Sequence, residues 1–263
     1  MDNSGRRPPT PPPSLPAIPG EVAPGTLPGE VAELVGELSE TTSPSRRRRL
    51  TEALARIAGR TGRVGWHSVR SAVRWLTTET LALVPRIPVR DLQTLRTQFP
   101  NLPPEDLAEA LIQGASRASA GVGAAAGAAM ILPLPAAPIE IAVETLTLVG
   151  IEVKLVAELH EVYGMRAPGT TSDRMLAYLG AWSHRRGVAL GPTGLILAVG
   201  SPLRRRLQRR LIARAGRSAL SLGPLLTGAL AGAALNRRET RRLGHDVRED
   251  LRRRSPYTSR WSS

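Results

Sequence analysis

Residues capable of acid–base or metal chemistry gather in the segment Ile139–Tyr163. His160 and Glu161 begin like the His-Glu-x-x-His motif of zinc proteases, in which two histidines one helical turn apart ligate the metal and the glutamate is the general base. Gly164 stands where the second histidine belongs. A carboxylate-bridged metal site would need Glu-x-x-His pairs, but the residue three positions before His160 is Ala157. The sequence therefore predicts no metal site here.

The same segment predicts a charged helix. Five of its residues share one helical face and are typical of a solvated stripe with i,i+4 contacts: Glu140, Glu144, Lys154, Glu158 and Glu161. Glu152 points away from that face. It must have a partner if it is buried, because an unpaired buried carboxylate is costly.

A glycine-rich run, GVGAAAG from Gly121 to Gly127, is similar in spacing to the fingerprint of dinucleotide-binding proteins. That fingerprint follows a strand, whereas the preceding residues, EDLAEALIQGASRASA, have helical periodicity. The sequence therefore predicts no cofactor site. Glycines spaced four residues apart instead favour close packing between helices, at four positions: Gly123, Gly127, Gly228 and Gly232.

No other set of residues indicates a reaction. The chain has no cysteine, which removes disulfides, thiolate metal sites and cysteine nucleophiles. Lys154 follows a valine rather than a glycine, so it does not belong to a P-loop. Serines near His67, His184 and His245 are too scattered to indicate a catalytic triad. We predict no catalytic residues and no cofactor, and an enzyme without a recognisable motif stays as one alternative.

Composition favours helices over sheets. Only 3% of the residues are aromatic, with a single phenylalanine, so the core must be built from Ala, Leu, Val and Gly. We expect an all-α protein, a compact helical bundle with Gly/Ala-rich helical hairpins. Two basic amphipathic helices are expected between Arg46 and Glu79. Further helices are expected at Pro104–Leu132, Ile139–Tyr163, Arg174–His184, Leu203–Ala219 and Arg237–Arg254.

Three regions are expected along the chain. Residues 1–45 are rich in proline and are predicted to form a disordered tail. Four residues within it have the spacing of one weak amphipathic helix: Val31, Leu34, Val35 and Leu38. Residues 46–254 form the folded domain, and residues 255–263 are a disordered C-terminal end. Deletion of residues 1–45 is therefore expected to leave the folded domain intact.

The net charge of +14 is unevenly distributed. Residues 46–98 carry a net +9 and residues 201–263 a net +12, whereas residues 99–200 between them carry −3. All but one of the 36 basic residues are arginine, which pairs well with phosphate, although a GC-rich genome gives the same bias. The helix expected at Leu203–Ala219 has an apolar stripe that leaves five arginines to face an anionic surface: Arg204, Arg205, Arg206, Arg209 and Arg210.

Two apolar stretches approach the composition of a membrane span. Ala118–Ile139 has 22 uncharged residues, but prolines limit its regular helix to about 22 Å. Ser218–Asn236 is shortened in the same way if its helix begins at Pro224. Because the hydrocarbon core is about 30 Å thick, we expect peripheral binding, with transmembrane insertion as the alternative. The N-terminal residues have no apolar run of a secretory signal, so we expect the inner, cytoplasmic face of the cell membrane.

Three stretches carry a family resemblance: LIQGASRASAGVGAAAGAAMILPLPAAP, the helix end VAELHEVYG, and LGPLLTGALAGAALNRRETRRLG. Over roughly residues 100–250 the chain resembles the bacterial EcsC family. The resemblance implies a bacterial, membrane-associated protein linked to an ABC-transporter operon. It supplies no catalytic residues.

Together these features favour a membrane-associated, non-catalytic accessory or structural protein. It would bind an anionic membrane surface or a membrane protein through its Arg-rich helices. The alternative is a nucleic-acid-binding helical module, since the same charge would neutralise phosphates. The shortage of aromatic side chains, which stack on exposed bases, argues against that alternative.

Overall fold

The computed structural model describes residues 26–40, 69–128, 137–191, 194–197 and 223–255. Several predictions fall outside these ranges. They concern the helix at Leu203–Ala219, the first of the two basic helices after Arg46, the tail up to residue 25 and the C-terminal end beyond Ser255.

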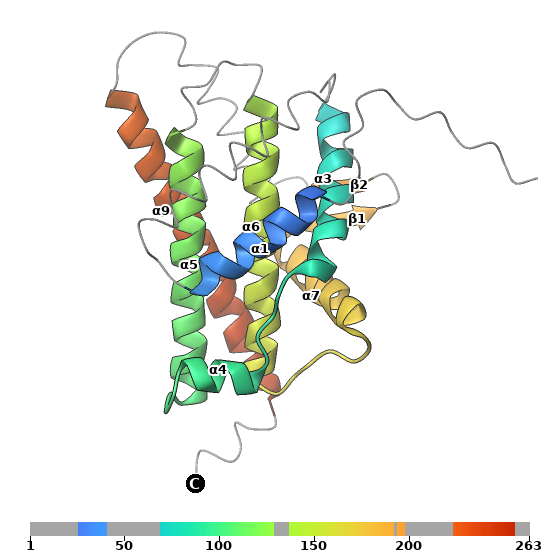
Figure 1. Cartoon of the computed structure of the whole chain (residues 1–263), viewed down its shortest axis with the longest axis vertical. Coiled ribbons are helices and arrows are strands. Elements are labelled where there is room, and N and C mark those ends of the chain that lie inside the picture. Colours follow the sequence, from blue (N-terminus) through green and yellow to red (C-terminus); the bar gives the residue numbers. More distant parts are fainter. Residues whose placement is uncertain (1–25, 41–68, 129–136, 192–193, 198–222, 256–263) are drawn as a thin grey trace, which may run out of the picture.

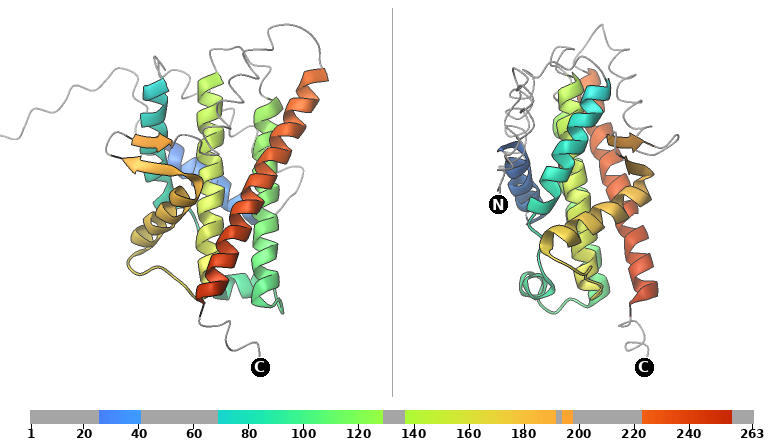
Figure 2. Two further views of the ribbon diagram at one scale, coloured as in Figure 1. Left: turned by 180° about the vertical axis from the view of Figure 1, so that it is seen from behind. Right: turned by 90° about the vertical axis from the view of Figure 1, so that its right-hand side faces the viewer.

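The described part of the chain is an all-α bundle, as predicted. Its seven α-helices are α1 (Thr26–Glu40), α3 (Val69–Leu83), α4 (Leu92–Gln98), α5 (Pro104–Ala128), α6 (Ala137–Val162), α7 (Thr171–Arg186) and α9 (Gly223–Arg254), with a 3-10 turn, η1 (Val84–Arg86), after α3. The helices α5 and α6 are antiparallel neighbours along the long axis (Figure 1). On one side α1 crosses them, and on the other side lies α9 (Figure 2).

The central element of the bundle is α6. Its neighbours are α1, α3, α5, α7 and α9, which surround it. Side chains on every side of the helix are therefore buried, including Leu146, Ile151, Leu155 and Leu159. A helix that is buried on every side is typical of the centre of a bundle rather than of its surface. This central place decides the environment of every charged residue that α6 carries.

The first helix corrects the predicted domain boundary. Within α1, Val31 and Val35 are completely buried and contribute to the same core as α6. A Cβ atom added to Gly150 of α6 would lie only 2.8 Å from Cγ2 of Val35, so the two helices pack closely. The predicted disordered tail therefore does not include residues 26–40, and deletion of these residues would remove part of the core. Helices of this length gain most of their stability from burial of their apolar face, which overrides weak local propensity.

Local signals set most helix ends. Pro104 starts α5, with Glu105 and Asp106 in its first turn, as predicted. Gly164 follows α6 with a φ of 66°, a left-handed conformation that glycine adopts without strain. Thr170 caps α7 through a reciprocal capping box with Asp173.

One feature was not predicted from the sequence. A short antiparallel hairpin follows α7, formed by β1 (Val188–Gly191) and β2 (Gly194–Leu197), with Val188 opposite Leu197. Strands of four residues are too short to show a periodicity. The charged helix expected at Arg237–Arg254 continues from the Gly/Ala-rich stretch, as predicted, and both belong to α9.

Candidate functional site

One end of the bundle, here called the Gly/Ala end, is formed by residues 118–128 of α5, the first turns of α6 and residues 223–234 of α9 (Figure 1). Residues 223–236 of α9 and residues 118–128 of α5 contain no charged side chain. These two stretches lie against each other because α5 and α9 are antiparallel. At the Gly/Ala end both helices are therefore uncharged, whereas their opposite ends carry charged residues.

Two glycines predicted at a helix contact meet at this end. A Cβ atom added to Gly123 would lie 2.5 Å from the carbonyl oxygen of Gly232, so the backbones of α5 and α9 touch there. Gly127 lies one turn closer to the C-terminal end of α5, and Gly228 lies one turn closer to the N-terminal end of α9. Farther along the same helix pair, a Cβ atom on Gly244 would lie 2.7 Å from Cγ1 of Ile112. Small residues thus set the distance between α5 and α9.

A row of exposed residues runs down the outer face of α9. Leu230 is 70% exposed, and Ala231 and Ala234 are exposed beside it. One turn further, four exposed arginines form what we call the arginine band: Arg237, Arg238, Arg241 and Arg242. Steps of three and four residues keep all of these positions on one side of the helix. An apolar surface therefore borders directly on a cationic one.

The arginine band is not neutralised by neighbouring carboxylates. Within the described part of the chain, Arg237, Arg238 and Arg242 form no ion pair, and Nε of Arg241 lies 3.3 Å from Nε2 of His245. The described residues contain 19 basic and 19 acidic side chains, so their net charge is zero. The arginine band is thus a local excess of positive charge on a neutral body.

Two segments outside the described residues carry most of the net positive charge of the chain. Residues 41–68, with seven arginines and one glutamate, lead into α3, and residues 198–222, with seven arginines and no acid, lead into α9. Both helices begin at the Gly/Ala end (Figure 1). These two segments carry a net +13 of the total +14. The predicted arginines Arg204, Arg205, Arg206, Arg209 and Arg210 belong to the second segment and lie outside the described residues.

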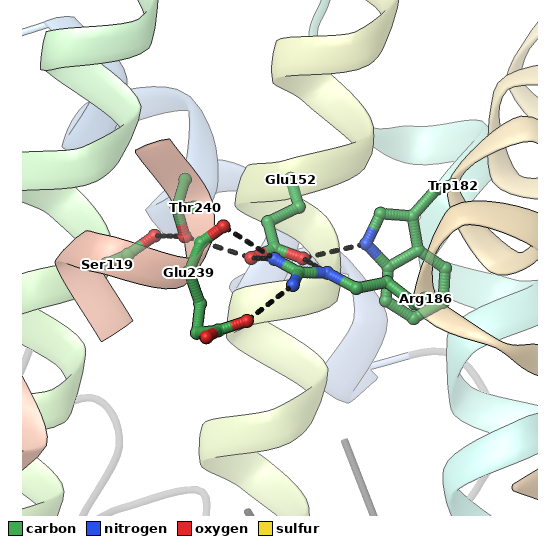
Figure 3. Close-up of polar contacts among 6 residues, drawn as sticks. All are labelled: Ser119, Glu152, Trp182, Arg186, Glu239 and Thr240. Carbon is green, nitrogen blue, oxygen red and sulfur yellow. Dashed lines mark hydrogen bonds and ion pairs between the residues drawn. The ribbon is translucent and has the colours of Figure 1, made fainter. Parts of the chain in front are cut away.

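The second chemically distinctive region is a buried ionic cluster around Glu152 of α6 (Figure 3). Arg186 of α7 forms an ion pair with this carboxylate and donates from Nε to Oε2 at 3.0 Å. Trp182 donates its indole N–H to the same oxygen at 2.8 Å. The hydroxyl of Thr240 lies 2.9 Å from both Oε1 of Glu152 and Oγ of Ser119, so it can donate to the carboxylate and accept from the serine. The cluster therefore joins α5, α6, α7 and α9.

The contacts of Glu152 determine its charge state. Burial by itself would raise the pKa of Glu152, but the charge of Arg186 and hydrogen bonds from Arg186, Trp182 and Thr240 hold this pKa below its ordinary value. Arg186 also pairs with Glu239 at 3.2 Å. Glu152 is therefore an ionised, fully partnered carboxylate, and the prediction that it must be paired if buried is confirmed.

A second cluster surrounds Glu158, four residues after Lys154 on α6. Arg90 binds Glu158 with two donors, Nε at 2.8 Å and Nη2 at 2.7 Å, and Lys154 pairs with it at 2.8 Å. Burial would raise the pKa of Glu158, and these two cations hold it below the ordinary value instead. Gln98 of α4 accepts from Nη1 of Arg90 at 2.8 Å. Because Arg90 also binds Glu158 of α6, it links α4 to α6.

The prediction of a solvated stripe on this helix is wrong for Glu144, Lys154 and Glu158, whereas Glu161 is part-exposed and pairs with Arg166, and the side chain of Glu140 lies outside the described part. Glu144, Lys154 and Glu158 are each only 2–3% exposed. The expected i,i+4 contact between Lys154 and Glu158 exists, but it lies in the core. Because neighbouring helices enclose α6 on every side, its charged face meets partners from them rather than water. Glu144, for example, accepts from Nδ2 of Asn236 at 3.1 Å.

These clusters have the properties of structural ion pairs. A general base or nucleophile needs access to a substrate, whereas the oxygens of Glu152 and Glu158 are occupied by donors within the fold. Among the described residues, no group of three or more His, Asp or Glu side chains is arranged to hold a metal ion. His160 packs against the ring of Tyr178, with the ring centroids 4.9 Å apart. The arginine band, by contrast, is exposed on the outer face of α9.

Sequence reasoning placed the arginine band in the charged helix after the Gly/Ala stretch but did not single it out. The available signal was four arginines within six residues directly after fourteen uncharged ones, 223–236.

Comparisons of this chain with protein families, with curated proteins and with solved structures found no match. None of the helices within the described ranges has the length and apolar character needed to cross a bilayer.

Proposed function

We propose that this protein is a non-catalytic accessory or structural protein that binds peripherally to an anionic membrane surface through the outer face of α9. The inner face of the cell membrane would be such a surface. The observation that carries the proposal is the exposed arginine band on α9, adjacent to exposed apolar residues of the same helix.

Charge distribution supports this orientation. The described body has no net charge, and its four arginines Arg237, Arg238, Arg241 and Arg242 form a local positive excess on the outer face of α9. A body with a local excess of positive charge is turned by the field of an anionic surface so that the charged face approaches first. Each arginine near such a surface contributes about 1 kcal/mol of binding free energy, which falls as salt screens the charge.

The neighbouring side chains favour lipid over nucleic acid. Leu230 and Ala234 border the arginine band, and α9 contains no Phe, Tyr or Trp on which a base could stack. Single-stranded nucleic acids are usually held by such aromatic stacking together with cationic side chains. A membrane instead offers phosphate groups above an apolar layer, which matches the order of residues along α9.

The test uses vesicle co-sedimentation of the full chain with a triple variant, Arg237→Gln/Arg238→Gln/Arg242→Gln. The matched control is Arg252→Gln/Arg253→Gln/Arg254→Gln, which removes the same charge from exposed positions at the opposite end of α9. Because three arginines are removed at about 1 kcal/mol each, we expect the first variant to bind phosphatidylglycerol vesicles at least tenfold more weakly. The control should bind nearly as well as the unchanged chain.

Equal binding of both variants would contradict the proposal. If instead the first variant keeps its affinity for vesicles but loses retention on DNA or RNA, the nucleic-acid alternative replaces the membrane.

A further inference from the structure

The histidine that follows the arginine band along α9 supports an inference that rests on the proposed function. We propose that His245 is a proton switch for the arginine band. In its neutral form it binds Arg241. In its protonated form it releases Arg241 and adds a fifth positive charge to the outer face of α9. The chain therefore binds an anionic membrane surface more strongly at mildly acidic pH than at neutral pH.

The contact between Arg241 and His245 defines the protonation state of the imidazole ring. Nε of Arg241 lies 3.3 Å from Nε2 of His245. A guanidinium group has five donors and no acceptor, so Nε2 of the histidine must be the acceptor. A histidine that accepts at Nε2 is neutral and carries its proton on Nδ1. In this structure that proton is on the nitrogen that lies 3.8 Å from Oε2 of Glu109.

The charged groups around His245 come from two helices. Arg241 and Arg248 lie on α9 itself, one turn before and one turn after the histidine. Glu109 lies on α5 and accepts from Nη1 of Arg248 at 2.8 Å. The helices α6 and α7 also meet α9, but among the described residues they contribute no hydrogen bond or ion pair to His245. Protonation of the ring is therefore felt by two arginines and one carboxylate.

Protonation breaks the contact with Arg241. Nε2 of the imidazolium is a donor, and both side chains are then cations, so they repel each other. Arg241 is exposed and has no second side-chain partner within the described ranges. Its guanidinium group is then available to bind a lipid phosphate with two donors. The imidazolium lies three and four residues after the last arginines of the band and thus extends the same cationic face.

Glu109 gives the protonated ring a partner without detaching Arg248. A carboxylate has two oxygens with about four acceptor positions, so it can accept from both cations. The approach of 3.8 Å between Nδ1 and Oε2 needs only a small movement of the ring to become a hydrogen bond. The side chain of His245 is 34% exposed, which leaves room for this movement. The switch therefore requires side-chain motion and no change of the helices.

The direction of the pH effect follows from which groups titrate. Histidine is the side chain whose ordinary charge change falls between pH 5 and pH 8, whereas arginine stays charged throughout. The pKa values of the buried Glu152 and Glu158 are held below the ordinary value, so the ionic clusters of the core stay ionised in this window. As the pH falls from 8 to 5.5, the outer face of α9 gains positive charge, and its affinity for an anionic surface rises.

The test measures co-sedimentation of the full chain with phosphatidylglycerol vesicles at pH 8 and at pH 5.5 in the same salt. We expect the unchanged chain to bind about fivefold more tightly at pH 5.5, which is the effect of one added cation near an anionic surface. His245→Gln keeps an oxygen that can accept from Arg241 but cannot be protonated. It should match the unchanged chain at pH 8 and lose most of the gain at pH 5.5.

Two further variants control this comparison. His184→Gln removes an exposed histidine from the last turn of α7 and should keep the full gain at pH 5.5. His245→Lys carries a permanent charge, so at pH 8 it should bind about fivefold more tightly than the unchanged chain. Circular dichroism at both pH values should show the same helix content in all variants, because His184 and His245 lie outside the core.

The outcomes separate the switch from the proposed function. A full gain of affinity at pH 5.5 in His245→Gln would overturn the switch, while the membrane-binding proposal stands. The switch is equally wrong if His245→Lys binds no more tightly than the unchanged chain at pH 8. If the unchanged chain does not sediment with phosphatidylglycerol vesicles at either pH, the proposed function fails and the switch fails with it.

Discussion

The charges on α6 and the charges on α9 have opposite surroundings. Glu152 and Glu158 lie in the core, and each is held by at least one cation and several hydrogen bonds. Arg237, Arg238 and Arg242 are exposed, share one sign and form no ion pair within the described residues. Charge that is matched inside the fold positions helices relative to one another. Charge left unmatched on the outer face of a neutral body remains available to a partner.

The largest expected effect comes from unbalancing a buried cluster. Replacing Arg186 by methionine leaves Glu152 ionised and buried without its counter-ion, which should lower the free energy of unfolding by about 3–5 kcal/mol. Urea denaturation followed by circular dichroism measures this loss. The control is Arg253→Met, because Arg253 and Glu249 form an exposed i,i+4 pair worth less than about 1 kcal/mol.

A second change sharpens this test. Adding Glu152→Gln to Arg186→Met removes the uncompensated charge, so the double variant should recover part of the lost stability. A double variant that is destabilised by the full sum of the two single changes would show that the pair does not act as a unit.

The contact between α5 and α9 predicts opposite results at two glycines of one helix. Gly123→Ala places a methyl group 2.5 Å from a backbone carbonyl oxygen and should cost about 1–3 kcal/mol. Gly121→Ala meets no atom within 4 Å and should stabilise the protein by about 0.5–1 kcal/mol, since alanine favours helix. Thermal unfolding of the two variants gives the comparison. A similar melting temperature for both would mean that α5 and α9 are not in backbone contact.

The buried carboxylates also predict how stability depends on pH. The pKa values of Glu152 and Glu158 are lower in the folded protein than the ordinary value of 4.5. Such groups add stability above the unfolded-state pKa and lose it as the pH falls toward the folded-state pKa. The free energy of unfolding should therefore decrease below about pH 5. Glu158→Gln should be less stable at pH 7 and should show a shallower decrease; an unchanged slope would contradict this assignment.

Local sequence signals were sufficient for several helices and for one helix contact. Pro104 and Gly164 marked the start of α5 and the end of α6 because these residues restrict or permit backbone angles directly. The glycine spacing identified Gly123 and Gly232 as contact positions, and the structure places them together.

Features that depend on neighbours could not be predicted in the same way. Periodicity shows which charges of α6 share a face, but it does not show that other helices cover every face, so the stripe with Glu144 and Glu158 was assigned to solvent. The apolar spacing in α1 was visible, but its burial depends on the distant partners α3, α5 and α6. The arginine band lay within a predicted helix, and only the burial pattern of α9 shows that these arginines face outward.

The division between matched and unmatched charge is tested most directly by two measurements on one sample. For Arg237→Gln/Arg238→Gln/Arg242→Gln, both the affinity for phosphatidylglycerol vesicles and the free energy of unfolding are determined. Exposed arginines without ion pairs should leave the free energy of unfolding within about 0.5 kcal/mol of the unchanged chain, while vesicle affinity falls at least tenfold. Unchanged vesicle affinity together with a large loss of stability would show that the arginine band serves the fold rather than a membrane.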